Sequence, residues 1–296
     1  MINSKSEKIF LIINRCAGHG QGEKAVKQVV PFLKVNGCQV EYVFTERPGH
    51  ATELARKASE DGFDVVVAVG GDGTVNETAL GLMGTETVMG IIPMGSGNGL
   101  ARELGLSMNM MKSARSLIEG SNLLMDVCKL NEQRFLCTSG IGFDAQVAYK
   151  MSKASSRGFL KYVQLTVSES ISFKPLAVKM TIDDTTLEKN VFLITFANAS
   201  QFGNNAFIAP GASMTDGLID VVVVRKFAKL WMPVFAIALF SKLVPRLPFV
   251  ECYKARKIEL QLAETPHYHF DGEPGSLSIP ASIEMDRLKI WVRSGK

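Results

Sequence analysis

The sequence has few cysteines, no long apolar run and no basic stripe, and each absence excludes a class of protein. The five cysteines are scattered, odd in number and never spaced as C-x-x-C, which argues against a disulfide framework or a zinc site and indicates a reducing compartment. The longest apolar stretch, 230–240, contains Pro233 and falls short of the about 20 residues that span a membrane. A net charge of only +4, without a dense basic stripe, predicts no nucleic-acid partner.

Two common phosphate-binding motifs and a secretory leader are also missing. No G-x-x-x-x-G-K-[ST] loop occurs, and no G-x-G-x-x-G follows the first apolar strand, which disfavours a P-loop NTPase and a nicotinamide dehydrogenase. Residues 1–8 are polar, and the apolar run 9–13 is too short for the core of a signal peptide. We therefore expect a cytoplasmic protein.

The first third of the chain alternates apolar strands with helical stretches. Hydrophobic residues make up 46% of the 296 residues, enough for an ordinary packed core, and the length suits two domains. The strand–helix order predicts an α/β domain with a parallel sheet, whose ligands bind at the loops after the carboxyl ends of the strands. The expected strands are 9–14, 39–45, 64–69 and 89–92, and the expected helices are 18–33, 51–60 and one from about residue 76.

After residue 125 the pattern changes to many short strands with turn signals between them. Such a pattern predicts a β-sandwich or barrel. We place the nucleotide-binding α/β domain at 1–125 and the second domain at 126–296, and the last strand can return to the first domain. Helical stretches are expected near 150–171 and 227–243. The expected strands are 124–130, 134–140, 176–182, 190–197, 219–224, 257–262, 268–270, 282–285 and 288–292.

The most informative loop is Gly70–Glu77, with the sequence GGDGTVNE, directly after the β-branched strand 64–69. Its glycines let the backbone approach a ligand with N–H groups exposed, and Thr74 can cap the helix that follows. A helix N-terminus favours a phosphate, but a carboxylate in such a loop would repel it unless a cation lies between them. Asp72 therefore predicts Mg²⁺, held directly or through water.

A second glycine loop, Gly95–Arg102, also follows a strand and enters a helix. Gly95, Gly97 and Gly99 open its backbone, and Ser96 and Asn98 offer side-chain hydrogen bonds. The segment 14–20 after the first strand can wrap a phosphate, although by itself it fits a plain connecting loop better.

Together these segments resemble the catalytic domain of the diacylglycerol kinase family, which includes bacterial soluble lipid kinases and sphingosine kinases. The matching segments lie in the family's order and span nearly the whole chain. They are residues 70–77, 92–102, 45–51, 140–145, 215–220 and 271–274.

The resemblance implies a first domain like that of NAD kinases and phosphofructokinases, followed by a β-sandwich domain that receives the lipid. It also implies ATP as the phosphate donor. The implied ATP contacts are Asn14, Gly18, Thr45, Gly71, Asp72, Gly73, Thr74, Asn76, Glu77 and Ser96.

The turn Asp271-Gly272-Glu273 carries two carboxylates, and either could accept the proton of an attacking hydroxyl. The resemblance points to this turn as the general base, and the sequence does not choose between Asp271 and Glu273. Without the resemblance, a D-G pair also fits an ordinary hairpin turn. We expect Asp72 to contribute to catalysis through magnesium.

The resemblance assigns two further sites. The segment from Ser213 to Leu218 resembles the family's structural magnesium loop, with Asp216 as the carboxylate and Ser213 and Leu218 as further oxygen ligands. Asp144 lies where sphingosine kinases contact the polar head of the lipid, although it also fits a turn carboxylate. The sequence departs from the bacterial pattern at Gly99, where many members carry Asp, and this leaves that part of the magnesium arrangement open.

We therefore expect a lipid kinase that transfers the γ-phosphate of ATP to the hydroxyl of diacylglycerol or a sphingoid base at the inner face of the membrane. Aromatic and basic residues within 230–250 fit an interfacial docking surface, and slightly better a helix packed on the core of the second domain. The open alternatives are an NAD kinase-like enzyme and a non-catalytic nucleotide-binding regulator. The sequence leaves a homodimer open.

Overall fold

The chain folds into two domains, and the first is built from both ends of the sequence. The computed structural model describes residues 6–154, 159–262 and 266–295. Met1–Met125 and Leu288–Lys296 form the first domain, and Asp126–Arg287 form the second.

A six-stranded sheet forms the centre of the first domain, in the order β2-β1-β3-β4-β17-β5. Its strands are parallel from β2 to β17, and β5 runs antiparallel at the edge. The strands are β1 (Lys8–Ile13), β2 (Gln39–Phe44), β3 (Val65–Gly70), β4 (Val88–Pro93), β5 (Ser121–Met125) and β17 (Ile290–Ser294). The helices are α1 (Ala17–Gly20), α2 (Gly22–Val35), α3 (His50–Glu60), α4 (Asp72–Leu82), α5 (Gly99–Glu103) and α6 (Met110–Glu119).

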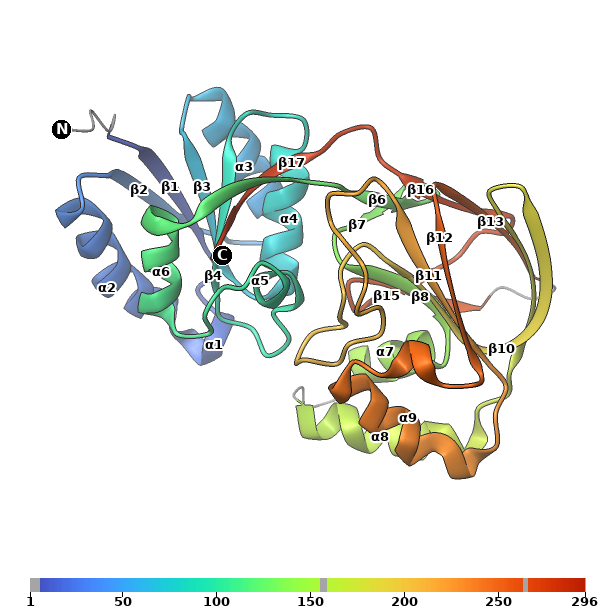
Figure 1. The fold of residues 1–296 in the computed structure, drawn as a ribbon. Coiled ribbons are helices and arrows are strands. Elements are labelled where there is room, and N and C mark those ends of the chain that lie inside the picture. Colours follow the sequence, from blue (N-terminus) through green and yellow to red (C-terminus); the bar gives the residue numbers. More distant parts are fainter. Residues whose placement is uncertain (1–5, 155–158, 263–265, 296) are drawn as a thin grey trace. The chain divides into compact units, whose positions relative to one another are not determined.

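Helices cover both faces of this sheet, which explains why β3 and β4 are buried along their whole length. Helices α2 and α6 pack on one face, whereas α3 and α4 pack together on the other (Figure 1). Gly90 lets α6 approach closely, because a Cβ there would lie 2.5 Å from the Leu117 side chain. The parallel α/β fold expected from the sequence is present.

The four strands that precede the predicted ligand loops end at the same edge of the sheet. Ile13 of β1 pairs with Phe44 of β2 on one side and with Val69 of β3 on the other. Val69 in turn pairs with Ile92 of β4, so the four strands end level with one another. The loops that follow them therefore gather along this edge, as parallel topology requires.

The segment 124–130, expected as one strand, is two strands in two different sheets. Asp126 breaks it, because its backbone N–H bonds to Met214 O (2.8 Å) and its Oδ2 accepts a hydrogen bond from Gly217 N–H (2.9 Å). These bonds bind residue 126 to the second domain, so the chain leaves the first sheet after Met125.

The second domain is a β-sandwich-like domain whose strands pair in the order β15-β14-β8-β10-β9-β13-β16-β6-β7, with β11 and β12 continuing from β10. Its first strands are β6 (Cys128–Leu130), β7 (Gln133–Phe135), β8 (Thr138–Gly142), β9 (Leu176–Ile182), β10 (Thr185–Ala197) and β11 (Ile219–Arg225). Its last are β12 (Val250–Ala255), β13 (Lys257–Leu262), β14 (His267–Phe270), β15 (Glu273–Ser276) and β16 (Ala281–Met285). The helices are α7 (Phe143–Ser152), α8 (Phe159–Ser172) and α9 (Met232–Ser241), with short 3₁₀ turns η1 (Lys229–Trp231) and η2 (Val244–Arg246).

Residues 191–197 of β10 and 221–224 of β11 are buried on both faces, which accounts for the mainly apolar sequence of these stretches. Alternate residues such as Ile194 and Val223 point into the inner core of the sandwich. Their neighbours, such as Phe192 and Val224, belong to an outer cluster that α7 and α9 cover. This outer cluster explains why helices interrupt the strands.

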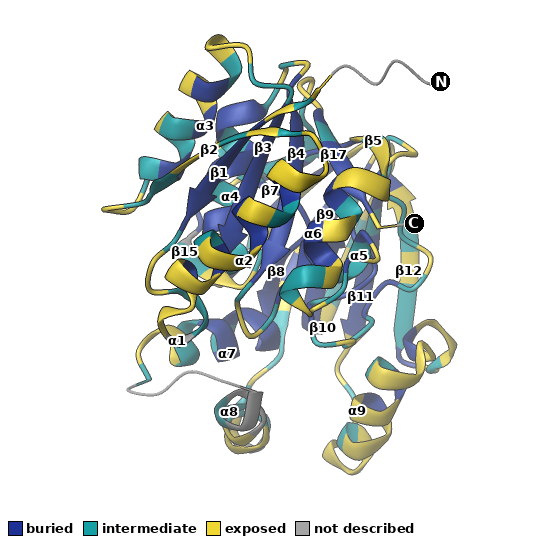
Figure 2. Cartoon of the chain, turned by 90° about the vertical axis from the view of Figure 1, so that its left-hand side faces the viewer, coloured by how far each residue is buried: buried dark blue, intermediate teal, exposed yellow. Residues whose placement is uncertain are grey.

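Helices α8 and α9 project at one end of the second domain, with many exposed residues (Figure 2). Among the helices in the described parts of the chain, none combines the length and apolarity needed to cross a membrane.

Candidate active site

The two glycine loops of the first domain pack directly against each other. A Cβ on Gly95 would lie 2.8 Å from the Cα of Gly71, and a Cβ on Gly97 would lie 2.9 Å from Asp72 Oδ2. Only glycine permits such an approach of two backbones. Some of these glycines therefore serve contact between the loops, whereas a Cβ on Gly73 would meet nothing within 4 Å.

Asp72 joins the two loops. Its Oδ2 accepts a hydrogen bond from Asn98 N–H (2.9 Å), and its Oδ1 accepts one from Gly99 N–H (2.8 Å). The carboxylate thus caps the N-terminus of α5. Each oxygen keeps a further lone pair, so the carboxylate still fits a magnesium ion, directly or through water.

The helix after the first loop begins at Asp72, not near Asn76 as the sequence predicts. Thr74 therefore lies in its first turn and does not cap it. Its hydroxyl instead accepts a hydrogen bond from Asn14 Nδ2 (3.3 Å), which links the loop after β1 to the loop after β3. Asn14 Oδ1 accepts a further bond from Cys16 N–H (3.0 Å), so this side chain is fixed on both sides.

The segment after β2 is tied to the same loop through Glu77. Glu77 Oε2 accepts a hydrogen bond from Ala51 N–H (3.2 Å) at the start of α3, and Thr52 Oγ1 donates to Glu77 O (2.8 Å). Thr45 lies at the end of β2, where its N–H bonds to Ile13 O (2.9 Å). The fold thus brings Thr45, Glu77 and the loop after β1 to one edge of the sheet.

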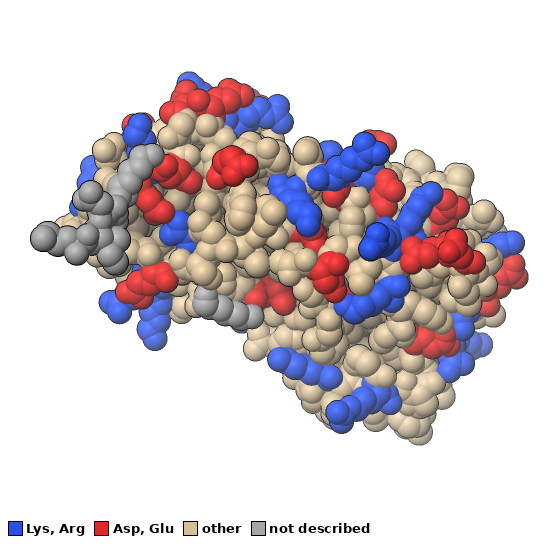
Figure 3. Space-filling view, turned by 45° about the horizontal axis from the view of Figure 1, so that its top comes forward, with Lys and Arg blue, Asp and Glu red and all other residues tan. Residues whose placement is uncertain are grey.

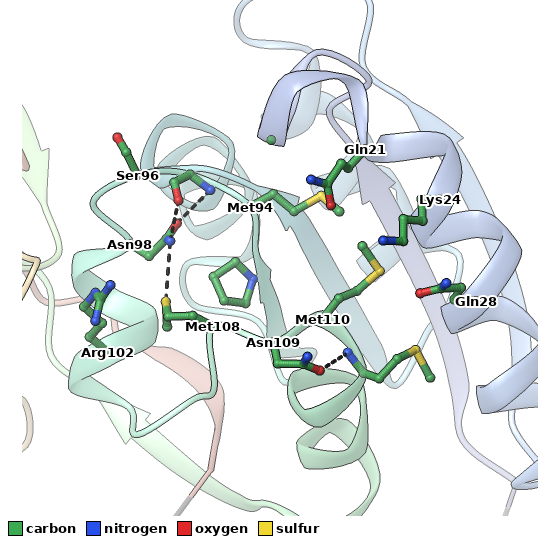
Figure 4. Close-up of a pocket in the computed structure, with 14 residues that line it drawn as sticks. Gln21, Lys24, Gln28, Met94, Ser96, Asn98, Arg102, Met108, Asn109 and Met110 are labelled. Carbon is green, nitrogen blue, oxygen red and sulfur yellow. Dashed lines mark hydrogen bonds between the residues drawn. The ribbon is translucent and has the colours of Figure 1, made fainter. Parts of the chain in front are cut away.

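A hollow of about 390 Å³ opens beside Gly18 and Ser96, two of the predicted ATP contacts (Figure 4). Lys24 points into it from α2, and Arg102 flanks its other side with Nε bonded to Gly97 O (3.0 Å). Sequence reasoning missed Lys24. The signal was the row of polar residues at 21, 24 and 28, which repeats along α2 just after the segment 14–20.

The two carboxylates of the turn 271–273 differ in their surroundings. Asp271 Oδ1 accepts hydrogen bonds from Cys137 N–H (2.7 Å) and Thr138 N–H (3.0 Å), and its Oδ2 accepts one from Leu136 N–H (2.7 Å). Asp271 therefore holds the turn against the chain that leads into β8, with its own backbone at φ 48°. Glu273 is exposed, and no hydrogen bond or ion pair to its side chain is found within the described residues.

Asp144 is buried at the start of α7 and bonded on both oxygens. Its Oδ2 lies 3.1 Å from His269 Nε2 and accepts from Thr195 Oγ1 (3.3 Å), and its Oδ1 accepts from Ala145 N–H (2.8 Å). Gly140 makes room for this pair, because a Cβ there would lie 2.7 Å from Asp144 Oδ2. Sequence reasoning missed His269, which lies on β14 two residues before the turn at Asp271.

The predicted structural magnesium loop is held by a lysine. Asp216 Oδ2 lies 2.8 Å from Lys254 Nζ, and its Oδ1 accepts from Leu218 N–H (3.1 Å). The same ammonium lies 3.2 Å from Asp220 Oδ2, and Ser213 Oγ lies 3.3 Å from Thr215 Oγ1. A cation beside Asp216 would have to displace Lys254, so this donor set does not fit a metal as it stands.

No other cluster of metal-binding side chains is found in the described part of the chain. Over residues 6–154, 159–262 and 266–295, no group of three or more His, Cys, Asp or Glu side chains is placed to hold a metal ion. The predicted role of Ser213, Asp216 and Leu218 stays a prediction.

Two family models match the chain, one after the other. A family model described as the diacylglycerol kinase catalytic domain matches residues 8–130. A second, described as the YegS C-terminal NAD kinase beta sandwich-like domain, matches residues 138–291.

Characterised and solved relatives match over nearly their whole length. A probable lipid kinase YegS-like from Chromohalobacter salexigens is 30% identical, over 90% of this chain and 86% of the relative. A diacylglycerol kinase from Bacillus subtilis is 27% identical, over 90% of each chain. The crystal structure of a putative diacylglycerol kinase from Bacillus anthracis is 26% identical, covers 99% of this chain and 98% of its own, and superposes with a TM-score of 0.83.

Proposed function

The chain belongs to the diacylglycerol kinase and YegS-like lipid kinase family, and from this we propose that it transfers the γ-phosphate of ATP to the hydroxyl of a membrane lipid, with Mg²⁺. The observation that carries the proposal is the pairing of the two glycine loops through Asp72 at the carboxyl edge of the sheet. Family membership supports kinase activity, and the choice of lipid acceptor is our inference from it.

The first domain binds the nucleotide. The N–H groups at the start of α4 face the phosphates, and Asn14, Thr45, Thr74 and Ser96 orient them. The hollow beside Gly18 and Ser96 has a volume within the usual range of ligand pockets. Asp72 holds Mg²⁺, which when bound neutralises charge on the phosphates during transfer.

Glu273 is the general base of the proposed reaction. Because Asp271 is committed to three peptide N–H groups, Glu273 is the carboxylate of this turn that is free to accept a proton. It takes the proton of the acceptor hydroxyl as the hydroxyl oxygen bonds to the γ-phosphorus and ADP leaves. Asp144 is the residue proposed to contact the polar head of the acceptor, and His269 and Thr195 hold its carboxylate.

The acceptor lies in a bilayer, so the enzyme works at the inner face of the membrane.

The test is phosphotransfer from radiolabelled ATP to diacylglycerol, sphingosine and NAD in parallel, each with Mg²⁺. We expect label in a lipid product, and a fall in kcat of about 100-fold or more for Glu273→Gln. Glu132→Gln, an exposed glutamate elsewhere in the same domain, is the matched control. Label in NAD alone would show a soluble acceptor, and no label in any acceptor would show a non-catalytic protein.

A further inference from the structure

Helix α9 is apolar on every side, yet the domain covers only half of it. Phe235 and Ala238 are buried in the outer cluster, with 4% and 3% of their surface exposed. The opposite side carries Ile237, which is 66% exposed, and Phe240, which is 51% exposed. A helix that is apolar all round is normally covered all round, whereas this one leaves Ile237 largely exposed on its outer side.

The exposed side forms part of a larger patch, which we call the docking face. It is defined by the exposed large apolar residues from the segment around α9, which are Leu230 (89%), Trp231 (43%), Val234 (41%), Ile237 (66%), Phe240 (51%) and Leu243 (39%). Elsewhere in the described chain such residues are scattered singly, as Val35 and Val167 are. A concentrated apolar patch marks a surface for a partner or a membrane.

Charge around the docking face has one sign. Residues 225–250 contain five lysines or arginines and no aspartate or glutamate. Lys229 and Arg246 are exposed at either end of α9, and Lys242 ends the helix with its Nζ 4.4 Å from the ring of Phe207. The lower edge of the second domain in Figure 3 is accordingly mostly tan with blue side chains.

We propose that the docking face inserts into the interface of an anionic bilayer, with α9 lying along the membrane plane. Apolar side chains enter the acyl region while the flanking cations meet the acidic headgroups, and Trp231 lies at headgroup level, as tryptophan prefers. This proposal rests on the proposed function, because it supplies the contact with the bilayer that a lipid acceptor requires.

A second copy of the chain fits this face less well. A two-fold contact would place the docking face on its own copy, and so bring Lys229, Lys242 and Arg246 close to the same cations. An anionic lipid surface complements these charges instead.

Trp231 provides a direct probe. The chain has two tryptophans, so Trp291→Phe leaves Trp231 alone to report. We expect its emission to shift to the blue, and to be quenched by brominated lipid chains, with vesicles that contain phosphatidylglycerol but not with pure phosphatidylcholine. An unchanged spectrum with both vesicles, or equal binding to both, would overturn the proposal.

A surface variant tests the apolar contribution. Leu230→Ser with Ile237→Ser should weaken co-sedimentation with anionic vesicles by about tenfold or more, because these are the two most exposed side chains of the docking face. Val35→Ser, at an equally exposed site of the first domain, is the control and should bind as the unmodified chain does. Equal binding by the double variant would overturn the proposal, and a dimer in solution that the double variant abolishes would identify a second copy as the occupant.

Phosphotransfer measurements on dissolved and on vesicle-bound substrate distinguish this proposal from the proposed function. On short-chain diacylglycerol dissolved as monomers, the double variant should keep its kcat, whereas on vesicles its rate should fall with its binding. Vesicle binding without phosphotransfer would contradict the kinase proposal but not the docking face. If the double variant phosphorylated lipid on vesicles as fast as the unmodified chain, the docking face would be contradicted but not the kinase proposal.

Discussion

At the scale of single residues, acidic side chains that mark the chemistry in the sequence also hold the backbone. Asp72 caps α5, Glu77 caps α3 and Asp271 binds three peptide N–H groups. Glu273, by contrast, is exposed beside this fixed frame. A reactive carboxylate is best positioned when its neighbours are rigid, and in the proposed reaction Asp271 would provide that rigidity for Glu273.

Substitution of the two carboxylates of the turn should therefore affect the free energy of unfolding differently. Asp271→Asn replaces one acceptor oxygen by an amide that faces peptide N–H groups, and should lower the free energy of unfolding by about 1–3 kcal/mol. Glu273→Gln should change it by less than about 0.5 kcal/mol, because the side chain is exposed. Urea unfolding of both variants checks this, and equal stability of the two would contradict the assignment.

Lys254 should matter more to stability than an ordinary surface lysine. Burial raises the pKa of Asp220, against the opposing effect of Lys254. Lys254→Met leaves Asp216 and Asp220 without their cation, and should cost about 1–2 kcal/mol near neutral pH. Lys257→Met, which breaks an exposed pair with Glu259, is the control and should cost less than about 1 kcal/mol.

The effect of Lys254→Met should grow with pH. An acid whose pKa is raised in the folded protein favours folding while protonated, and this contribution is lost as the pH rises through the folded pKa. The variant should therefore lose most stability at pH 8 and least at pH 5 by thermal unfolding. Millimolar Mg²⁺ should raise its melting temperature more than that of the unmodified chain, since the ion and Lys254 compete for Asp216. An equal rise in both chains would show that Lys254 does not keep magnesium from Asp216.

At the scale of elements, the glycine loops form one unit through their backbones. Gly95 is tied to its own loop by Asn98, whose Oδ1 accepts from Gly95 N–H (2.9 Å) and whose Nδ2 donates to Gly95 O (2.7 Å). The Asn98 side chain therefore stabilises its own loop, although from the sequence it could also contact a ligand. Two loops joined in this way present their N–H groups as a single surface.

Glycine substitutions should separate packing from binding. Gly95→Ala places a methyl group against Gly71 and Asn98, and should cost about 1–3 kcal/mol of stability together with activity. Gly73→Ala meets open space in the first turn of α4, and should keep or gain up to about 1 kcal/mol. Its KM for ATP should rise if the phosphates approach there. Melting temperatures and ATP kinetics check both, and a stable, active Gly95→Ala would contradict loop packing.

Strand and loop order could be predicted from the sequence because apolar periodicity and glycine position depend on neighbours in the chain. The α/β domain, the β-sandwich-like domain and the family were predicted and confirmed. Contacts between distant residues could not be predicted. Lys254 reaches Asp216 because antiparallel pairing places it opposite Asp220, near the loop that carries Asp216. His269 reaches Asp144 because the same kind of pairing places it opposite Gly140, just before α7. The choice of Glu273 over Asp271 likewise depends on peptide N–H groups at residues 136–138.

At the scale of the whole molecule, the first domain is completed by the last segment of the chain. Strand β17 joins β4 to the edge strand β5 within the sheet. Its Arg293 is buried, with Nε donating to Asn122 Oδ1 (2.7 Å), Nη2 to Glu7 Oε1 (2.9 Å) and Nη1 to Leu117 O. One side chain thus connects the beginning, the middle and the end of the sequence.

Removal of residues 288–296 should therefore disable the first domain and spare the second. Without β17, β5 loses its pairing and the face under α6 is opened, so cooperative unfolding of the first domain and ATP binding should be lost. The second domain, which has its own core, should keep its unfolding transition in calorimetry. Arg293→Met is the milder test, and should cost about 1–3 kcal/mol because the buried carbonyl of Leu117 and the less buried oxygens of Asn122 and Glu7 lose their donor. Removal of residue 296 alone is the control. If the shortened chain bound ATP with unchanged affinity, β17 would be an accessory to the sheet, and the first 125 residues would make the nucleotide site by themselves.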